Sequence, residues 1–394
     1  MISQFRIALA DPVLRVPFLC ILLMGPAVAS ILPFQSVVGI ERLGMSDAAY
    51  AALVTFGSLF SVVASVTVGI LTDQTGRYRS ILLGCILVGI LAGALMFALP
   101  GIPSFVTVHA LLFPIAATTF TQYFALAALA AERNPDLDKD VGLSLVRAGF
   151  SGTFAITPPL WALAFARGVD LLSIYGLLLV ANIFVLMVVL FFWPKTPVHD
   201  DSNKSGLSFF EAVKEVAARR IQIRLVLISV VSSSNGLYNI LLGLLIINAL
   251  GGTEADVGWF AGLVALVEIP VMLYGAALVQ RYNRLAIILT GTLIYGLSLA
   301  ALGQVPSMAW AWVLIVPFGI GAGIILSVPV AYIQGLVAHR PGAGSSLLAM
   351  SHFGGTMMAS AIFAAGTKLF DYSGVAILGF LIALIAAVIL RRID

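Results

Sequence analysis

Long apolar runs recur along the whole chain, separated by short segments rich in charge, glycine or proline. A helix needs about 20 apolar residues to cross the hydrocarbon core of a bilayer. Barrel strands would instead alternate in hydrophobicity over about 10 residues. We therefore expect an all-α membrane protein with twelve transmembrane helices. They span roughly residues 13–40, 47–72, 80–99, 105–130, 141–167, 171–193, 222–249, 256–279, 285–303, 308–335, 343–367 and 374–390.

Composition supports this interpretation and excludes several other classes. Of 394 residues, 61% are hydrophobic and only 10% are charged, whereas soluble globular proteins carry about 25% charged residues. These values exclude a soluble enzyme and an intrinsically disordered chain. Cys20 and Cys85 are the only cysteines, so a disulfide scaffold is excluded. The net charge of +3 is too small for a nucleic-acid binder.

The distribution of basic residues predicts the orientation. Basic residues are retained on the cytoplasmic side of membrane proteins. With the N-terminus inside, 17 of the 21 basic residues fall in cytoplasmic segments. Only Arg42, Arg167 and Lys368 fall outside, and Arg147 lies within a predicted span. We therefore expect both termini to be cytoplasmic.

A polar segment in the middle of the chain separates two sets of six spans. We expect an N-terminal six-helix half over residues 1–193, a cytoplasmic linker over 194–221 and a C-terminal six-helix half over 222–394. An internal repeat supports this division, because the stretch from Gly69 to Gly84 matches the stretch from Gly275 to Gly291. Two repeated halves are typical of carriers that rock around a central site.

A tight basic turn between the second and third spans is the most specific motif. It contains Gly69, Asp73, Gly76, Arg77 and Arg79. Gly76 permits the reversal of the chain, and Asp73 can pair with the opposite half to form a conformational latch. A generic basic cytoplasmic turn would explain the arginines but not the glycine and aspartate spacing. The motif resembles the signature between the second and third helices of the major facilitator superfamily.

Further short segments resemble the bacterial sugar efflux transporter family within that superfamily. They are Gln122–Ala127, Arg147–Pro159, Asn235–Tyr238, Val267–Met272 and Gly342–Ser346. The chain departs from the family pattern at Leu241, where members carry an acidic residue, and at Ala128, where they carry a basic one. The resemblance implies export of small sugars across a bacterial inner membrane, driven by protons and without a cofactor.

Glu268 is the only carboxylate in the middle of a predicted span. It lies 12 residues from Asp256, or about 18 Å at 1.5 Å per residue. A charge at this depth costs at least about 2.5 kcal/mol, so it should face a wet cavity or bind a proton. We predict that Glu268 couples transport to protons; the alternative is a structural glutamate bonded to a neighbouring helix or to backbone near Pro270.

Neutral polar residues at the same depth are candidate solute contacts. Asn235, Tyr238 and Asn239 share one helix face, which Ser232 extends by a turn. Amides and a tyrosine suit a polyhydroxylated solute, although asparagines also bond helices to one another in membranes. Weaker candidates are Gln122, Gln35, Ser30 and Gln334.

The remaining titratable residues carry weaker hypotheses. His352 could contribute to proton coupling or simply pack, and the intramembrane Arg147 could contact the solute or extend to the cytoplasmic surface. His109 and His339 have no companions at ligand spacing, so we expect no metal site. No phosphate-binding glycine loop is present, so ATP should not drive the protein directly.

Together these features predict a monomeric, proton-coupled exporter of small sugars or sugar-like solutes. We expect no enzymatic activity, and we expect the partners to be the solute, protons and the lipid bilayer. A multidrug or metabolite/proton antiporter is the main alternative. A channel or a non-transporting sensor is a remote one.

Overall fold

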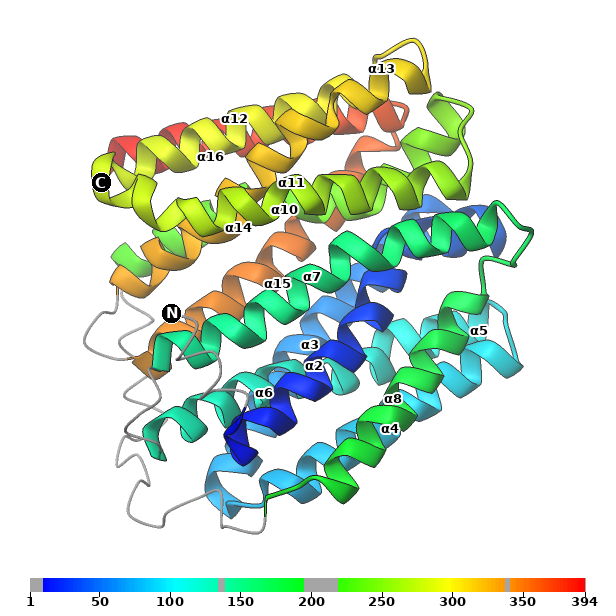
Figure 1. Ribbon diagram of the computed structural model, residues 1–394. Helices are drawn as coiled ribbons and strands as arrows, with labels where there is room; N and C mark the ends of the chain where they lie inside the picture. The colour runs from blue at the N-terminus through cyan, green and yellow to red at the C-terminus, as the bar shows by residue number, and fades with distance from the viewer. Residues whose placement is uncertain (1–9, 134–138, 195–218, 337–340, 394) are drawn as a thin grey trace. The chain divides into compact units, whose positions relative to one another are not determined.

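The computed structural model describes residues 10–133, 139–194, 219–336 and 341–393, and all regular structure in these ranges is helical (Figure 1). Each predicted span corresponds to a long helical segment. In the first six spans these are α2 (Pro12–Ile31) with η1 (Val37–Arg42), α3 (Asp47–Thr75), α4 (Tyr78–Ala98), α5 (Ile102–Thr107) with η2 (Val108–Leu112) and α6 (Phe113–Arg133), α7 (Lys139–Phe165) and α8 (Ser173–Phe191).

The last six spans follow the same plan. They are α10 (Arg219–Leu244) with η4 (Leu245–Ala249), α11 (Glu254–Arg281), α12 (Arg284–Leu302), α13 (Met308–Val313) with α14 (Ile315–Leu336), α15 (Pro341–Gly366) and α16 (Tyr372–Ile393). The all-α class with twelve spans is confirmed. Most of the predicted linker over 194–221 lies outside the described residues.

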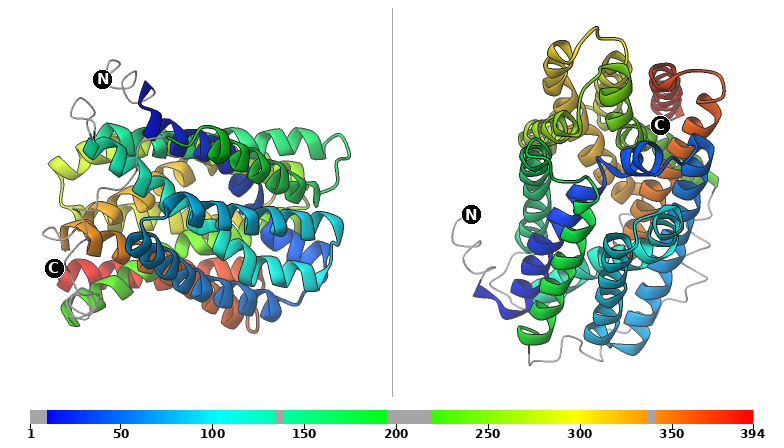
Figure 2. Two further views of the ribbon diagram at one scale, coloured as in Figure 1. Left: turned by 90° about the horizontal axis from the view of Figure 1, so that it is seen from below. Right: turned by 90° about the vertical axis from the view of Figure 1, so that its right-hand side faces the viewer.

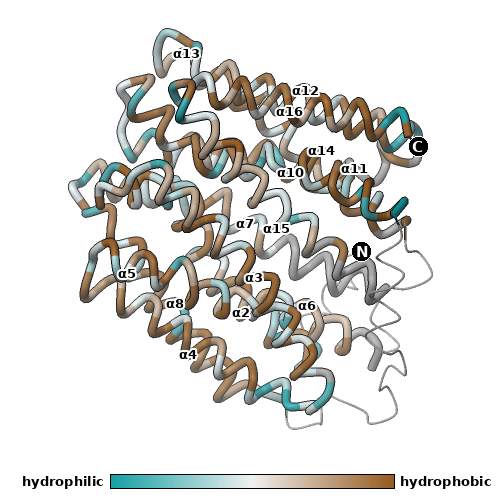
Figure 3. Tube along the Cα trace, turned by 180° about the vertical axis from the view of Figure 1, so that it is seen from behind, coloured by the Kyte–Doolittle hydropathy of each residue, from teal (hydrophilic) through white to brown (hydrophobic). Residues whose placement is uncertain are grey.

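The helices are apolar enough for a bilayer. Nine helices within the described ranges meet the length and hydropathy needed to cross a membrane. Figure 3 shows hydrophobic colour along most of their length. Large apolar side chains are exposed on them, including Phe191 at 78% and Leu273 at 74%. Such exposure is compatible with a lipid environment, and the chain is a multi-pass membrane protein.

Local sequence explains where the first span begins and where it is interrupted. Asp11 caps α2 by accepting hydrogen bonds from the backbone of Val13 at 2.8 Å and Leu14 at 3.0 Å. The predicted first span is interrupted between Ile31 and Val37. Pro33 lies in this interruption and has no backbone N–H to continue the helix ladder.

The chain forms two compact units whose limits differ from a simple cut at its middle. The first unit comprises Met1–Leu32, Phe60–Thr157 and Val169–Gly206. Within it α2 and α4 both pack against α6 and α8 (Figures 1 and 2). The second unit comprises Pro33–Leu59, Pro158–Gly168 and Leu207–Asp394. The predicted boundaries at 193 and 222 stay a prediction.

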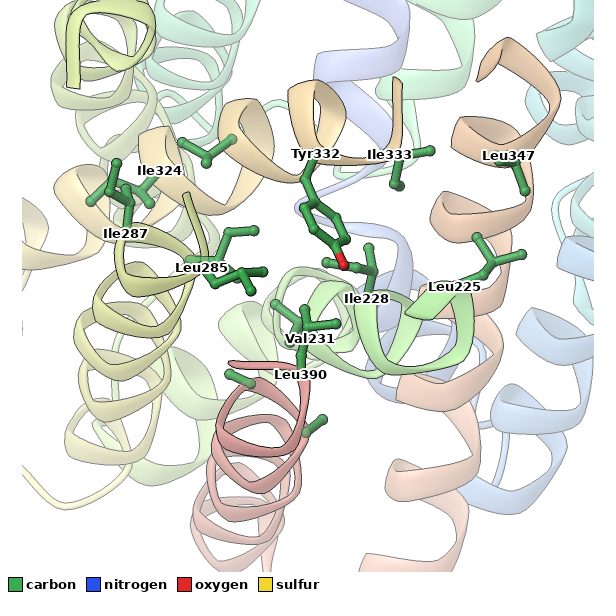
Figure 4. Close-up of a cluster of buried hydrophobic side chains, with 14 residues drawn as sticks. Leu225, Ile228, Val231, Leu285, Ile287, Ile324, Tyr332, Ile333, Leu347 and Leu390 are labelled. Carbon is green, nitrogen blue, oxygen red and sulfur yellow. The ribbon is translucent and has the colours of Figure 1, made fainter. Parts of the chain in front are cut away.

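An apolar core joins five helices of the second unit (Figure 4). Leu225, Ile228 and Val231 of α10 lie at its centre. Around them are Leu285 of α12, Tyr332 of α14, Leu347 of α15 and Leu390 of α16. Burial of these side chains holds one end of the helix bundle together.

The repeat predicted from the sequence continues in the structure beyond the basic turn. Gly44 follows η1 with φ 74°, and Gly251, 207 residues later, follows η4 with φ 64°. At the same spacing Gly89 of α4 meets Asn182 of α8, and Gly296 of α12 meets Phe380 of α16. Equivalent turns and close approaches therefore recur in the two halves.

Candidate functional site

Polar and aromatic side chains from four helices meet within the second unit. The hydroxyl of Tyr295 on α12 donates a hydrogen bond of 3.2 Å to Oδ1 of Asn235 on α10. The ring of Tyr295 lies 5.9 Å from that of Tyr238, and both rings lie 5.4 Å from Phe318 on α14. These contacts place the predicted face of the seventh span against the ninth and tenth spans.

Glu268 belongs to the same group of side chains. It lies close enough to Tyr238 and Tyr295 to interact with both electrostatically. It is half-buried near the middle of α11, which runs from Glu254 to Arg281. Its backbone carbonyl faces Gly323 of α14, where an added Cβ would lie 2.9 Å from the oxygen. We call Asn235, Tyr238, Glu268 and Tyr295 the Asn235–Glu268 site.

Exposure divides the site into two layers. Tyr295 and Phe318 are 0% exposed and Tyr238 is 8% exposed. Asn235, Asn239 and Glu268 are half-buried. The side chains of Asn235, Asn239 and Glu268 are therefore the groups that a solute can reach. The rings of Tyr238, Tyr295 and Phe318 are buried.

Gln35 lies in the second unit, in a helical turn just before η1. Its side chain is half-buried. This segment packs on α10, since Val37 contacts Gly243 one turn beyond Asn239. The structure thus brings the segment of Gln35 to the helix that carries the asparagines.

Gln122 lies in the first unit, within a separate polar cluster on α6. It is 4% exposed, and its Nε2 donates to Sγ of Cys85 at 3.8 Å. Its Oε1 has no hydrogen-bond partner among the residues that the structure describes. Thr118 also donates to Cys85, at 3.3 Å. Cys85 and the other cysteine, Cys20, are buried free thiols, which behave as small apolar residues.

The candidate residue His352 and the other described histidine, His109, differ in environment. His352 on α15 is exposed, and its ring lies 5.6 Å from that of Phe353. His109 is buried, and its Nε2 lies 2.7 Å from the hydroxyl of Tyr175. Within the described ranges no group of three or more His, Cys, Asp or Glu could hold a metal ion.

The basic turn has the geometry that its sequence requires. α3 ends at Thr75, Gly76 adopts φ 63° and α4 begins at Tyr78. Arg79 donates a 2.9 Å hydrogen bond to the carbonyl of Leu190 in the last turn of α8, where a cation is favourable. Gly69 and Arg77 are exposed. The side chains of Asp73, Arg147 and Gln334 lie outside the described part of the structure.

Hydrogen bonds at one end of the second unit were not predicted. Nδ2 of Asn248 donates to Glu41 at 2.8 Å, and the hydroxyl of Tyr372 donates to Asp47 at 3.0 Å. We call these two bonds the outer-end contacts, because the basic-residue distribution predicts that this end faces outside. One partner of each comes from the first two spans and the other from the seventh or twelfth. The sequence carried no signal for them beyond polar residues at span ends.

The long apolar helices and their exposed apolar side chains define a multi-pass membrane protein. The chain matches the family model of the Major Facilitator Superfamily over residues 17–237 and 224–394, and it belongs to this family. Its fold is similar to a crystal structure of the nucleoside transporter NupG in a mutant form, with a TM-score of 0.80 at 13% identity, covering 97% of this chain and 99% of that one.

Two relatives narrow the similarity further. The "Putative sugar efflux transporter" of Deinococcus radiodurans is 26% identical over 377 residues, or 91% of this chain and 92% of that protein. "Sugar efflux transporter A" of Dickeya chrysanthemi is 26% identical over 339 residues, or 84% of this chain and 81% of that protein. The resemblance inferred from the motifs is confirmed.

Proposed function

We propose that this protein exports small sugars or sugar-like solutes across a bacterial inner membrane in exchange for protons. It works as a monomer by alternating access, with both termini in the cytoplasm. The names of its relatives support the solute class and the direction of transport. The coupling and the contact residues are argued from the Asn235–Glu268 site.

The observation that carries the proposal is a neutral amide bonded to Tyr295 together with a carboxyl group that interacts with the same tyrosine, both in the middle of their spans. Asn235 can bond sugar hydroxyl groups without needing a charged solute. Glu268 can bind either a proton or, when ionised, the hydroxyl hydrogen of a sugar. A proton and a solute that compete for one carboxyl group produce exchange, because loading of one releases the other.

Alternating access requires contacts that form in one state and break in the other. The outer-end contacts suit this role, since each joins a residue of the N-terminal spans to one of the C-terminal spans. On this proposal Glu41–Asn248 and Asp47–Tyr372 hold the outside closed and separate when it opens. The basic turn with Asp73, Gly76 and Arg77 is the predicted latch on the cytoplasmic side.

A multidrug or metabolite/proton antiporter is the second candidate. The rings of Tyr238, Tyr295, Phe318 and Phe260 form a continuous aromatic group behind Glu268, with Phe260 5.6 Å from Phe318. Such a group favours flat apolar solutes if it becomes accessible in another conformer. The burial of this aromatic group favours the sugar proposal, since Tyr295, Phe318 and Phe260 are 0% exposed.

The test is uptake into proteoliposomes with a panel of radiolabelled sugars and lipophilic cations, with and without an imposed pH gradient. We expect the gradient to drive accumulation of at least one sugar and none of the cations. Gradient-driven movement of the cations alone would favour the antiporter of drugs. Sugar movement that does not depend on the pH gradient would favour facilitated diffusion instead.

A further inference from the structure

Tyr295 belongs to the Asn235–Glu268 site but cannot itself reach a solute in this state. Its side chain is 0% exposed, so no transported molecule can contact it in this state. Its hydroxyl nevertheless donates to Oδ1 of the half-buried Asn235 at 3.2 Å. Tyr295 can therefore contribute to solute recognition only through its neighbours, and Asn235 is the one that its hydroxyl group bonds.

The phenol ring of Tyr295 is held from two sides. The ring of Phe318 meets it edge-on at 5.4 Å with an interplanar angle of 89°, and the ring of Tyr238 lies 5.9 Å away. Its backbone is held as well, because an added Cβ at Gly321 of α14 would lie 2.7 Å from the nitrogen of Tyr295. α14 can approach α12 so closely only with glycine at this position. The hydroxyl group of Tyr295 is therefore held in a fixed position.

An asparagine amide has one end that accepts hydrogen bonds and one end that donates them. When Tyr295 donates to Oδ1, the Nδ2 group with its two hydrogens is the end that remains for a solute. The reverse orientation would present the acceptor instead. Binding through the wrong end would leave buried groups unpaired, which weakens affinity.

We propose that Tyr295 is a positioning residue that fixes the amide of Asn235 so that it presents hydrogen-bond donors to the solute. The site then selects solutes with an acceptor oxygen at this point, while the neighbouring Glu268 supplies the acceptor for a hydroxyl hydrogen. A sugar hydroxyl can satisfy both. This inference rests on the proposed function, because it assumes that Asn235 contacts a sugar.

The transport test compares Tyr295→Phe with Tyr175→Phe. Both variants remove one buried phenol oxygen, and Tyr175 bonds His109 in the first unit and is not part of the Asn235–Glu268 site. D-glucose and its monodeoxy and monodeoxyfluoro derivatives are the probes, because fluorine can accept a hydrogen bond but cannot donate one. KM and the maximal rate are measured by counterflow in proteoliposomes.

For the wild-type protein we expect one ring position at which the fluoro sugar has a lower KM than the deoxy sugar. In Tyr295→Phe this preference should disappear, and the KM for glucose should rise about 2- to 10-fold at an unchanged maximal rate. Tyr175→Phe should keep the preference. An intact preference in Tyr295→Phe would overturn the inference.

A second measurement does not depend on any sugar. The side-chain amide of Asn235 is followed by NMR in protein labelled with 15N-asparagine, its signals being identified by their loss in Asn235→Ser. In Tyr295→Phe we expect these signals to shift or broaden, with no change in Tyr175→Phe. Unchanged signals would refute the positioning role. A wild-type protein that transports no sugar would instead refute the proposed function, and the amide signals would still decide the role of Tyr295.

Discussion

The polar cluster around Asn235 in the second unit and the one around Gln122 in the first unit satisfy their amides in different ways. In the second unit the amide of Asn235 accepts a hydrogen bond from Tyr295, and a carboxyl group lies beside the pair. In the first unit the amide of Gln122 donates only to the weak acceptor Sγ of Cys85, and its Oε1 has no partner among the described residues. The arrangement around Asn235 in the second unit is fixed, and its carboxyl group can change charge. The arrangement around Gln122 in the first unit is neutral and incompletely bonded.

The internal repeat makes this difference informative. At the spacing of 207 residues that relates Gly44 to Gly251, the counterparts of Asn235, Glu268 and Tyr295 are Val28, Ser61 and Val88. None of the three counterparts can ionise at neutral pH. Two halves with the same helix plan thus carry different chemistry, and we infer that proton exchange belongs to the second unit.

The largest effect is expected when the ionisable carboxyl group of Glu268 is removed. Glu268→Gln keeps an acceptor oxygen for the solute but cannot take up or release a proton, so it should still exchange solute across the membrane but lose accumulation driven by a pH gradient. Counterflow and gradient-driven uptake in the same proteoliposomes separate the two activities. Glu254→Gln, in the first turn of the same helix, is the matched control and should behave as the wild type. Undiminished accumulation by Glu268→Gln would place the coupling elsewhere.

The next largest effect is expected when the amide of Asn235, which is bonded to Tyr295, is removed. Asn235→Ala leaves the hydroxyl of Tyr295 and the solute without a partner, so binding should weaken by about 1 to 3 kcal/mol. Asn239→Ala should also weaken binding. Asn182→Ala is the control from the first unit, because its amide donates to the carbonyl of Leu178 in its own helix at 2.8 Å. It should affect detergent stability rather than binding, as measured by titration calorimetry and thermal unfolding. Equal losses of binding and stability in Asn235→Ala would favour a purely structural bond.

The outer-end contacts should give a smaller effect. Tyr372→Phe removes one hydrogen bond to Asp47, worth about 0.5 to 1.5 kcal/mol. The population open to the outside should therefore rise about 2- to 10-fold. Labelling of a single cysteine introduced at the outer end, in a background without Cys20 and Cys85, measures this population. Tyr282→Phe, at an exposed position beyond the other end of α11, is the control. An unchanged labelling rate would remove Tyr372 from the proposed gate.

The smallest effect is expected in the first unit. Gln122→Leu removes an amide whose Oε1 is buried without a partner among the described residues, so the free energy of unfolding should stay the same or increase. If Gln122 contacts the solute in another conformer, affinity should fall less than in Asn235→Ala, with the same pH dependence as the wild type. A changed pH dependence in Gln122→Leu would contradict the division of chemistry between the units.

Much of the fold could be predicted because its signal is local. Twelve apolar runs of spanning length are visible in the sequence, and Gly76 marked a turn that indeed needs a positive φ. The interruption at Pro33 was missed, since the apolar run continues through it. The short π-helical ends η1 and η4 have no sequence signature that period or composition could reveal.

The site could be predicted only in part. Asn235, Tyr238 and Glu268 stand out because polar residues are expensive inside a membrane. Tyr295 and Phe318 do not stand out in the sequence, because aromatic residues within an apolar run are usually interpreted as packing residues. Their role depends on which helices meet, and that is set by close approaches such as Gly321 against Tyr295. The roles of Asn235, Tyr238 and Glu268 stay predictions, as do those of Asn239, Gln35, Gln122, His352, Arg147 and the residues of the basic turn.

Proton release on sugar binding tests the central claim most directly. Purified protein in weakly buffered detergent solution is mixed with the sugar that gives the largest gradient-driven uptake, and a pH indicator reports protons released. We predict that the wild-type protein releases protons, that Glu268→Gln binds the sugar without release, and that Glu254→Gln matches the wild type. Equal proton release by Glu268→Gln and the wild-type protein would contradict the account.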